Sequence, residues 1–140
     1  MGPVRAVEAV LPKMTEQQSG AIVLIGSTSV VEAMGGPQAY NAMKASLITW
    51  GKQLALFHGK DNIRVNTIAP GLVKTDFAKA LWDDPATLKR STATASLKRI
   101  GEPHEIAGAA VFLASPAGAF MTGQTMVIDG GVTTSGGGVG

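Results

Sequence analysis

The only tyrosine of this 140-residue chain, Tyr40, is followed four residues later by Lys44. Residues four apart lie on the same face of a helix, so the phenol and the ammonium group would be neighbours. A nearby ammonium group favours the ionised form of a phenol, which can then exchange a proton with a carbonyl or alcohol oxygen. Ser27 lies thirteen residues before Tyr40, and its hydroxyl could hold the substrate oxygen beside the phenol. These three residues are therefore the candidate catalytic group.

Ser27 is a poor candidate for a nucleophile, because a serine nucleophile needs a base and neither His58 nor His104 lies near it in the sequence. A proton donor, an oxygen-holding hydroxyl and a lysine instead fit the interconversion of a carbonyl and an alcohol. That reaction also needs a hydride, which no side chain supplies, so the group implies a nicotinamide cofactor. The Tyr-x-x-x-Lys spacing alone would equally suit an exposed tyrosine beside a solvated lysine, and only its setting makes it specific.

The composition argues against several other functions. The chain has no cysteine, which removes disulfides and thiolate sites, and with two separate histidines we expect no metal site. The net charge is +2, from 12 basic and 10 acidic residues spread along the chain, so we expect no nucleic-acid partner. No apolar run approaches the ~18 residues of a membrane span, and the N-terminus lacks the regions of a signal peptide. We therefore expect a soluble, cytoplasmic protein that does not bind membranes.

Stretches with helical spacing alternate with short apolar runs. The first helix begins near Pro3 and is closed by the polar stretch 15–20. A longer helix, from Pro37 to about Phe57, carries the Tyr-x-x-x-Lys pair, and another helix begins at Pro103. Three runs rich in β-branched residues are typical of buried strands: Ala21–Gly26, about Ile63–Ala69 and about Thr125–Asp129.

The helix from Pro37 to about Phe57 has two faces of different character. Its large apolar residues recur at steps of three and four and are expected to form its apolar stripe: Met43, Leu47, Trp50, Leu54 and Phe57. Another face carries small residues that would allow close packing against a second helix: Ala42, Ala45, Ser46 and Thr49.

Helical connections between continuous apolar strands predict a parallel sheet in an α/β fold of the doubly wound, Rossmann type, with helices on both faces. In such sheets ligands bind beyond the carboxyl ends of the strands. Ser27, Pro70-Gly71 and Asp129-Gly130-Gly131 each follow a predicted strand, so we expect them at this edge. Three strands with their helices make about half of such a domain, and no internal repeat supplies the rest.

Five segments, in this order, resemble the short-chain dehydrogenase/reductase family. They are VLIGSTS, QAYNAMKASL, NIRVNTIAPGLVKTDF, KRIGEPHEIAGAAVFLAS and MTGQTMVIDGG, and the resemblance covers about residues 3 to 131. It implies an oxidoreductase that uses NAD or NADP to interconvert a ketone and a secondary alcohol. The details are similar to both carbonyl reductases and 3-oxoacyl-carrier-protein reductases, and they do not choose between these branches.

The resemblance also implies roles for individual residues. Tyr40 would be the catalytic acid or base, and Lys44 would bind the ribose hydroxyls of the cofactor. Ser27 would hold and polarise the substrate oxygen, with Ser29 as a weaker candidate for that role. The other cofactor contacts would come from Pro70, Gly71, the backbone of Val73 and the hydroxyl of Thr75.

The segment from Asp76 to about Leu97 resembles the substrate lid of the family. Two of its aromatic residues, Phe77 and Trp82, would either touch an apolar substrate or pack the lid onto the core. Both interpretations stay open at the level of the sequence.

The chain departs from the family pattern at its start. Members begin with a strand and a glycine-rich turn that holds the pyrophosphate, and residues 1–140 contain no such turn. The residue that selects NAD or NADP, and an asparagine of the catalytic group, would lie in the same missing part. We expect residues 1–131 to be the C-terminal part of one domain and residues 132–140 to be a flexible tail. Such a chain would expose the edge of the strand Ala21–Gly26, bind dinucleotide weakly and turn over little substrate.

Two other interpretations also stay open. The small-residue face of the helix from Pro37 to Phe57 could form a helix bundle in a dimer or tetramer, an assembly that the family commonly builds with this helix. The chain would then be an interaction module. It could equally be a non-functional fragment that lacks the dinucleotide-binding half.

Overall fold

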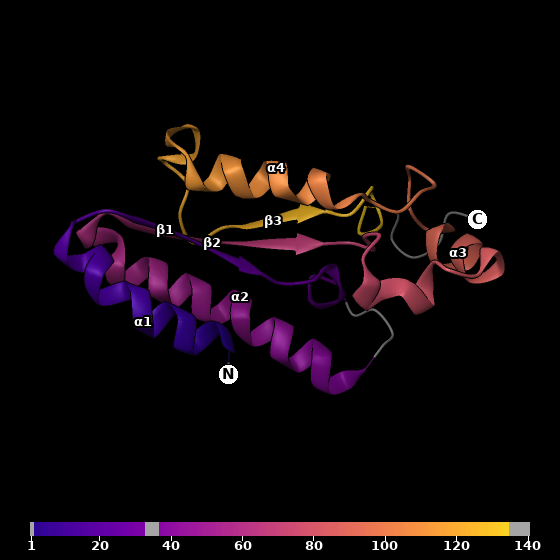
Figure 1. Ribbon diagram of the computed structural model, residues 1–140, viewed down its shortest axis with the longest axis horizontal. Coiled ribbons are helices and arrows are strands. Elements are labelled where there is room, and N and C mark those ends of the chain that lie inside the picture. Colours follow the sequence, from indigo (N-terminus) through magenta and orange to yellow (C-terminus); the bar gives the residue numbers. More distant parts are fainter. Residues whose placement is uncertain (1, 33–36, 135–140) are drawn as a thin grey trace.

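The computed structural model describes residues 2–32 and 37–134, and these form a sheet of three parallel strands (Figure 1). The strands are β1 (Gly20–Ile25), β2 (Ile63–Pro70) and β3 (Thr125–Ile128), in the order β1-β2-β3. Ala21 lies opposite Arg64, and Thr67 lies opposite Thr125. The strand ends agree with the predicted ones to within one residue.

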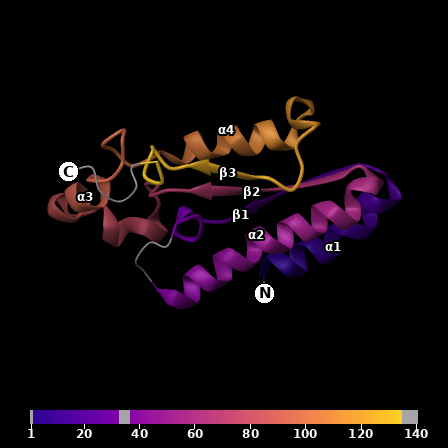
Figure 2. The same ribbon diagram turned by 180° about the vertical axis from the view of Figure 1, so that it is seen from behind.

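Helices cover both faces of this sheet. Figure 2 shows α1 (Gly2–Glu16) and α2 (Gln38–His58) together on one face, and α4 (Pro103–Ala114) on the other. The short helix α3 (Pro85–Thr92) lies beyond the carboxyl ends of the strands, where all three arrows in Figure 1 point. The predicted α/β architecture, a parallel sheet with helices on both faces, is confirmed.

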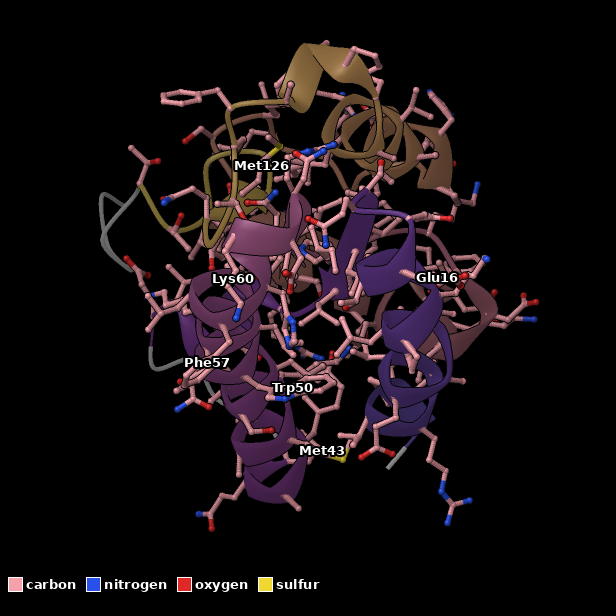
Figure 3. The ribbon with its side chains drawn as sticks, turned by 90° about the vertical axis from the view of Figure 1, so that its left-hand side faces the viewer. Glu16, Met43, Trp50, Phe57, Lys60 and Met126 are labelled. Atoms are coloured by element: carbon pink, nitrogen blue, oxygen red, sulfur yellow. The ribbon has the colours of Figure 1, made fainter. Side chains whose placement is uncertain are left out.

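The central strand β2 is the most buried element, because α2 packs on one of its faces and α4 on the other. Four of its apolar residues are at most 1% exposed: Ile63, Val65, Ile68 and Ala69. The main core lies between the sheet and the helices α1 and α2, with Val7, Leu24 and Leu54 at its centre. Trp50 packs partly against this cluster, in the space between α1 and α2 (Figure 3). The continuous apolar run of β2 therefore marks a strand that is covered on both sides.

The predicted apolar stripe of α2 is wrong at both ends. Met43 is 60% exposed and Phe57 is 63% exposed, and Figure 3 shows Phe57 pointing away from α1. The middle of the predicted stripe is confirmed, since Leu54 is buried and Trp50 packs against the core, and the buried residues of α2 also include Gly51 and Ala55. A Cβ atom on Gly51 would lie 3.1 Å from atoms of both Leu24 and Thr67, so α2 approaches the sheet closely at this glycine. The sheet therefore meets α2 at two small residues, Gly51 and Ala55, beside one large residue, Leu54.

Arg64 fastens the C-terminal end of α4 to the sheet. Its guanidinium donates to the carbonyl oxygens of Leu113 at 2.6 Å and Gly118 at 2.9 Å, with longer bonds to Ser115 and Met121. These carbonyls lie in the last turn of α4 and in the loop that follows it. One side chain of β2 thus satisfies helix-end acceptors that have no partner within the helix itself.

The chain beyond β3 continues as a turn. The Asp129 carboxylate accepts bonds from the N–H groups of Gly131 and Thr133, each at 2.8 Å. The predicted tail begins at residue 132, and residues 135–140 lie outside the described part, so its flexibility stays a prediction. Within residues 2–32 and 37–134, no helix combines the length and apolarity that a membrane span requires.

Candidate functional site

Lys44 connects helix α2 to the carboxyl end of β1. Its ammonium group donates a hydrogen bond of 2.7 Å to the carbonyl oxygen of Ile25, the last residue of that strand. Burial lowers the pKa of the Lys44 ammonium below its ordinary value of 10.5. An ammonium group has three donors, and this bond uses one of them, so two are left for other acceptors. Lys44 is thus held in place and can still bind hydroxyl groups.

Tyr40 lies between Lys44 and the segment that follows β2. The Lys44 nitrogen is 5.7 Å from the centre of the tyrosine ring. The ring of Phe77 is also stacked against it, with 6.3 Å between the ring centres and 26° between the planes. Phe77 belongs to η3 (Asp76–Leu81), a short 3-10 helix, and is itself 86% exposed. The phenol ring therefore has both a cation and an aromatic ring as neighbours, and the cation is the lysine that the helical spacing predicted.

Ser27 lies two residues after the end of β1 and caps η1 (Thr28–Val30). Its hydroxyl oxygen lies 2.9 Å from that of Ser29 and accepts a bond of 3.3 Å from the Ser29 N–H. Thr28 is buried and donates from its hydroxyl to the carbonyl oxygen of Pro70 at 3.2 Å. This bond ties the turn that carries Ser27 to the end of the neighbouring strand. Ser27 and Tyr40 make no hydrogen bond with each other in the described part of the chain.

The end of β2 supplies the remaining predicted site residues. Gly71 donates from its N–H to the carbonyl oxygen of Ile128 at 2.9 Å, and a Cβ atom there would lie 2.8 Å from the Cα of Asp129. Only glycine fits this crossing of two backbones. Val73 pairs with Gly101 in an isolated bridge, which holds the chain as it leaves Pro70.

Thr75 ends this segment and starts η3. Its hydroxyl donates weakly to the carbonyl oxygen of Val73 and accepts from the Ala78 N–H, both at 3.4 Å. Its carbonyl oxygen accepts a bond of 3.0 Å from the indole N–H of Trp82. Trp82 is thus packed on its own segment, which fits the packing interpretation of this aromatic. The two long bonds leave the Thr75 hydroxyl able to exchange one partner for another.

The structure therefore brings the sequence-predicted residues to one edge, since Ser27, Pro70 and Gly71 follow the ends of β1 and β2. Sequence reasoning missed two contributors, the Ile25 carbonyl and Thr28. Backbone groups leave no signal in a sequence, whereas Thr28, a polar residue directly after a buried strand, could have been suspected. No cluster of three or more His, Cys, Asp or Glu side chains suited to a metal occurs in residues 2–32 and 37–134.

Comparison with known proteins identifies close relatives. A family model described as enoyl-(acyl carrier protein) reductase matches residues 1–133. The dehydrogenase/reductase SDR family member 4 of Bos taurus is 40% identical over 124 residues, which cover 89% of this chain and 44% of that protein. The 3-oxoacyl-(acyl-carrier-protein) reductase FabG of Vibrio harveyi is 42% identical over 130 residues, which cover 91% of this chain and 52% of that protein.

A solved structure agrees with these relatives. The gluconate 5-dehydrogenase of Burkholderia cenocepacia, in complex with NADP and tartrate, superimposes with a TM-score of 0.91 at 32% identity, over 95% of this chain and 52% of that one. The chain thus spans about half the length of the relatives that it matches. The family model, the relatives and the shared fold together show that the chain belongs to the short-chain dehydrogenase/reductase family.

Proposed function

We propose that this chain is the catalytic half of an NAD(P)-dependent oxidoreductase that interconverts a ketone and a secondary alcohol. One observation carries the proposal: Lys44 is fixed by the Ile25 carbonyl at 2.7 Å and lies 5.7 Å from the ring centre of Tyr40. The arrangement holds a cation beside the only phenol of the chain, at the sheet edge where ligands of parallel α/β folds bind. The relatives named above are oxidoreductases by name, which supports the same class of reaction.

In this proposal Tyr40 moves the proton. It gives its phenolic proton to the carbonyl oxygen during reduction and takes it from the hydroxyl during oxidation. Lys44 holds a positive charge beside the phenol, and its two remaining donors bind hydroxyl groups of the cofactor. The Ser27 hydroxyl donates to the same substrate oxygen. A nicotinamide dinucleotide, when bound, supplies or accepts the hydride.

The cofactor pocket of the proposal lies at the end of β2. Pro70, Gly71 and the backbone of Val73 would line the nicotinamide side. The Thr75 hydroxyl would exchange one of its two 3.4 Å bonds for a cofactor atom. Neither the choice between NAD and NADP nor the choice between carbonyl-reductase and 3-oxoacyl-reductase substrates follows from these residues, so both alternatives are kept in the proposal.

The test uses the chain in a complete domain. Residues 1–140 would be fused behind the N-terminal part of the Vibrio harveyi reductase that they do not match. The fusion would be assayed with NADH and NADPH against simple ketones and 3-oxoacyl thioesters, by the loss of nicotinamide absorbance. We expect turnover with at least one pair. Tyr40→Phe keeps the ring beside Phe77 but removes the proton, so it should lower kcat by about 10²–10⁴-fold.

Two lysines on the same helix provide a matched control. Lys44→Met should lower kcat strongly, whereas Lys52→Met, which removes an exposed lysine two turns further along α2, should leave it unchanged. A folded fusion that is inactive with every substrate, or one that is equally active with Tyr40→Phe, would contradict the proposed function.

A second candidate function, assembly through α2, rests on the exposed face of that helix. Its small residues Ala42, Ala45, Ser46 and Thr49 are all exposed, and Leu56 beside Phe57 is 79% exposed. A second copy of the chain would cover this face in a dimer or tetramer. Native mass measurement would distinguish it from a monomer, and Ala45→Glu should convert an α2 assembly into monomers without unfolding the chain.

A further inference from the structure

A groove of about 730 Å³ opens beside η3, on the segment that follows the candidate catalytic edge. It runs between the η3–α3 pair and residues 98–102. Three half-buried apolar side chains line it, those of Trp82, Leu88 and Ile100. A groove of this size would accommodate a small organic ligand.

The groove concentrates positive charge. Its lining includes four cations, Lys74, Lys89, Lys98 and Arg99, and one carboxylate, Glu102. These give a net charge of +3, whereas the whole chain has a net charge of only +2. The rest of the chain therefore carries a slight negative excess, and the basic groove is a local feature rather than a reflection of the overall composition.

Two of the five charged groups are already committed. Arg99 donates both arms of its guanidinium to the Glu105 carboxylate, at 2.7 and 2.8 Å. The bond from Arg99 lowers the pKa of Glu105 to about 2, so the pair stays charged at neutral pH. Glu102 caps the N-terminus of α4, where its side chain accepts a backbone N–H. Arg99 and Glu105 thus neutralise each other, which leaves the three lysines and the single carboxylate of Glu102 in the groove lining.

The three lysines, in contrast, have no anionic partner. Within residues 2–32 and 37–134, none of them forms an ion pair with a carboxylate. The Lys98 ammonium donates to the carbonyl oxygen of Ala93 at 2.7 Å, and that of Lys74 lies 5.6 Å from the centre of the Trp82 ring. Both partners are neutral, so they orient the ammonium groups and leave their charges uncompensated.

The backbone at Lys98 adds a second indication. Its φ is +54°, in the left-handed region that a residue with a side chain rarely occupies. Hydrogen bonds on either side hold it there, from Leu97 N–H to Gly130 O and from Lys98 N–H to Ala95 O. Non-glycine residues in this conformation are often found at ligand sites, because surrounding contacts must maintain the strain.

We propose that this groove binds an organic phosphate monoester whose substituent is apolar. Three unpaired ammonium groups match a phosphate of charge about −1.5 to −2 better than a carboxylate of charge −1. Lysine binds phosphate as a point charge and needs no forked geometry, which here is already used by Arg99 on Glu105. The apolar substituent would lie against Trp82, Leu88 and Ile100, where it is removed from water.

The test is an NMR titration of the 140-residue chain with hexyl phosphate. The two tryptophans give two indole N–H signals. Trp82 lines the groove, whereas Trp50 packs against the core between α1 and α2, does not line the groove and serves as an internal control. We expect a saturable shift of the Trp82 signal, with a Kd on the order of 1 mM, and no shift of the Trp50 signal.

Three further probes separate the parts of the ligand. Inorganic phosphate lacks the apolar substituent, hexanol lacks the charge and hexanoate carries a single charge. Each should bind at least about tenfold more weakly than hexyl phosphate. Inorganic phosphate binding as tightly would overturn the role of the apolar lining, and hexanoate binding as tightly would overturn the choice of phosphate. An unmoved Trp82 signal would overturn the site itself.

Matched double variants test the lysines. Lys89→Met combined with Lys98→Asn removes two groove charges, and asparagine tolerates the left-handed backbone at position 98. Lys52→Met combined with Lys60→Asn removes two exposed charges elsewhere. The first double variant should raise the Kd of hexyl phosphate about tenfold, and the second should leave this Kd unchanged. Equal weakening in both would show that only the net charge matters. This binding does not depend on Tyr40, so it stands or falls separately from the proposed oxidoreductase activity.

Discussion

Lys44 is the residue through which β1 and α2 jointly shape the candidate site. Its bond to the Ile25 carbonyl sets the position of the charge, and its partial burial makes that charge less favourable than in water. The same lysine therefore lies 5.7 Å from the centre of the Tyr40 ring at some cost to its own protonation. A lysine in open solvent would not lose hydration of its charge, but no contact would hold it at a fixed position beside Tyr40.

The lowered pKa of Lys44 predicts a pH dependence of stability. Between its folded pKa and 10.5, the unfolded chain binds a proton at this lysine more readily than the folded chain does. The contribution of Lys44 to the free energy of unfolding should therefore rise as the pH rises through this window. Urea unfolding of the wild type and Lys44→Met at a series of alkaline pH values measures it as a difference. A difference that falls with pH would contradict the assignment, and Lys52→Met provides the reference.

At the scale of elements, the site depends on the close approach of the two backbone segments that leave the carboxyl ends of β2 and β3. Gly71 is the tightest point, since an added Cβ would lie 2.8 Å from the Cα and 3.2 Å from the carbonyl oxygen of Asp129. Both are backbone atoms that cannot move aside singly. We expect Gly71→Ala to lower the free energy of unfolding by about 1–3 kcal/mol.

A second glycine substitution controls for this effect. Gly108 lies inside α4, and an added Cβ there would meet no atom within 4 Å. Gly108→Ala should therefore stabilise the chain by up to about 1 kcal/mol, because alanine favours the helix. Urea unfolding curves of both variants check the pair. Equal stabilisation by the two alanines would show that the crossing of β2 and β3 is looser than the structure indicates.

The sequence predicted elements better than contacts. The strands were recognisable because each contains a continuous apolar run, such as Ala21–Gly26, and β2 is buried on both of its faces. The buried face of α2 was not, because it is set by the close approach at Gly51, where the absence of a side chain matters more than any large residue. The bond from Lys44 to Ile25 could not be predicted either, since a carbonyl oxygen has no residue type. Local sequence patterns thus predicted that Tyr40 and Lys44 share one helix, whereas the groups that contact them depend on tertiary packing.

At the scale of the whole molecule, the described fold has one well-covered strand and two edge strands. β2 is paired on both sides, whereas β1 and β3 each have a partner on one side only. The unpaired side of β1 lies next to Ser27, so whatever pairs with this edge also borders the candidate site. The chain spans about half the length of its relatives, and a further strand along β1 is where the other half of a doubly wound sheet would join.

This arrangement predicts that the 140-residue chain alone binds dinucleotide poorly. In the proposed function, Tyr40, Lys44 and Thr75 would contact one end of the cofactor, but no glycine-rich turn in the sequence provides a helix N-terminus for the pyrophosphate. Calorimetric titration with NADH and NADPH should give a Kd weaker than about 1 mM for the chain, and micromolar binding for the fusion described above. Circular dichroism must show that both samples are folded. Micromolar binding by the chain alone would mean that assembly of several copies completes the site, which native mass measurement on the same sample would then reveal.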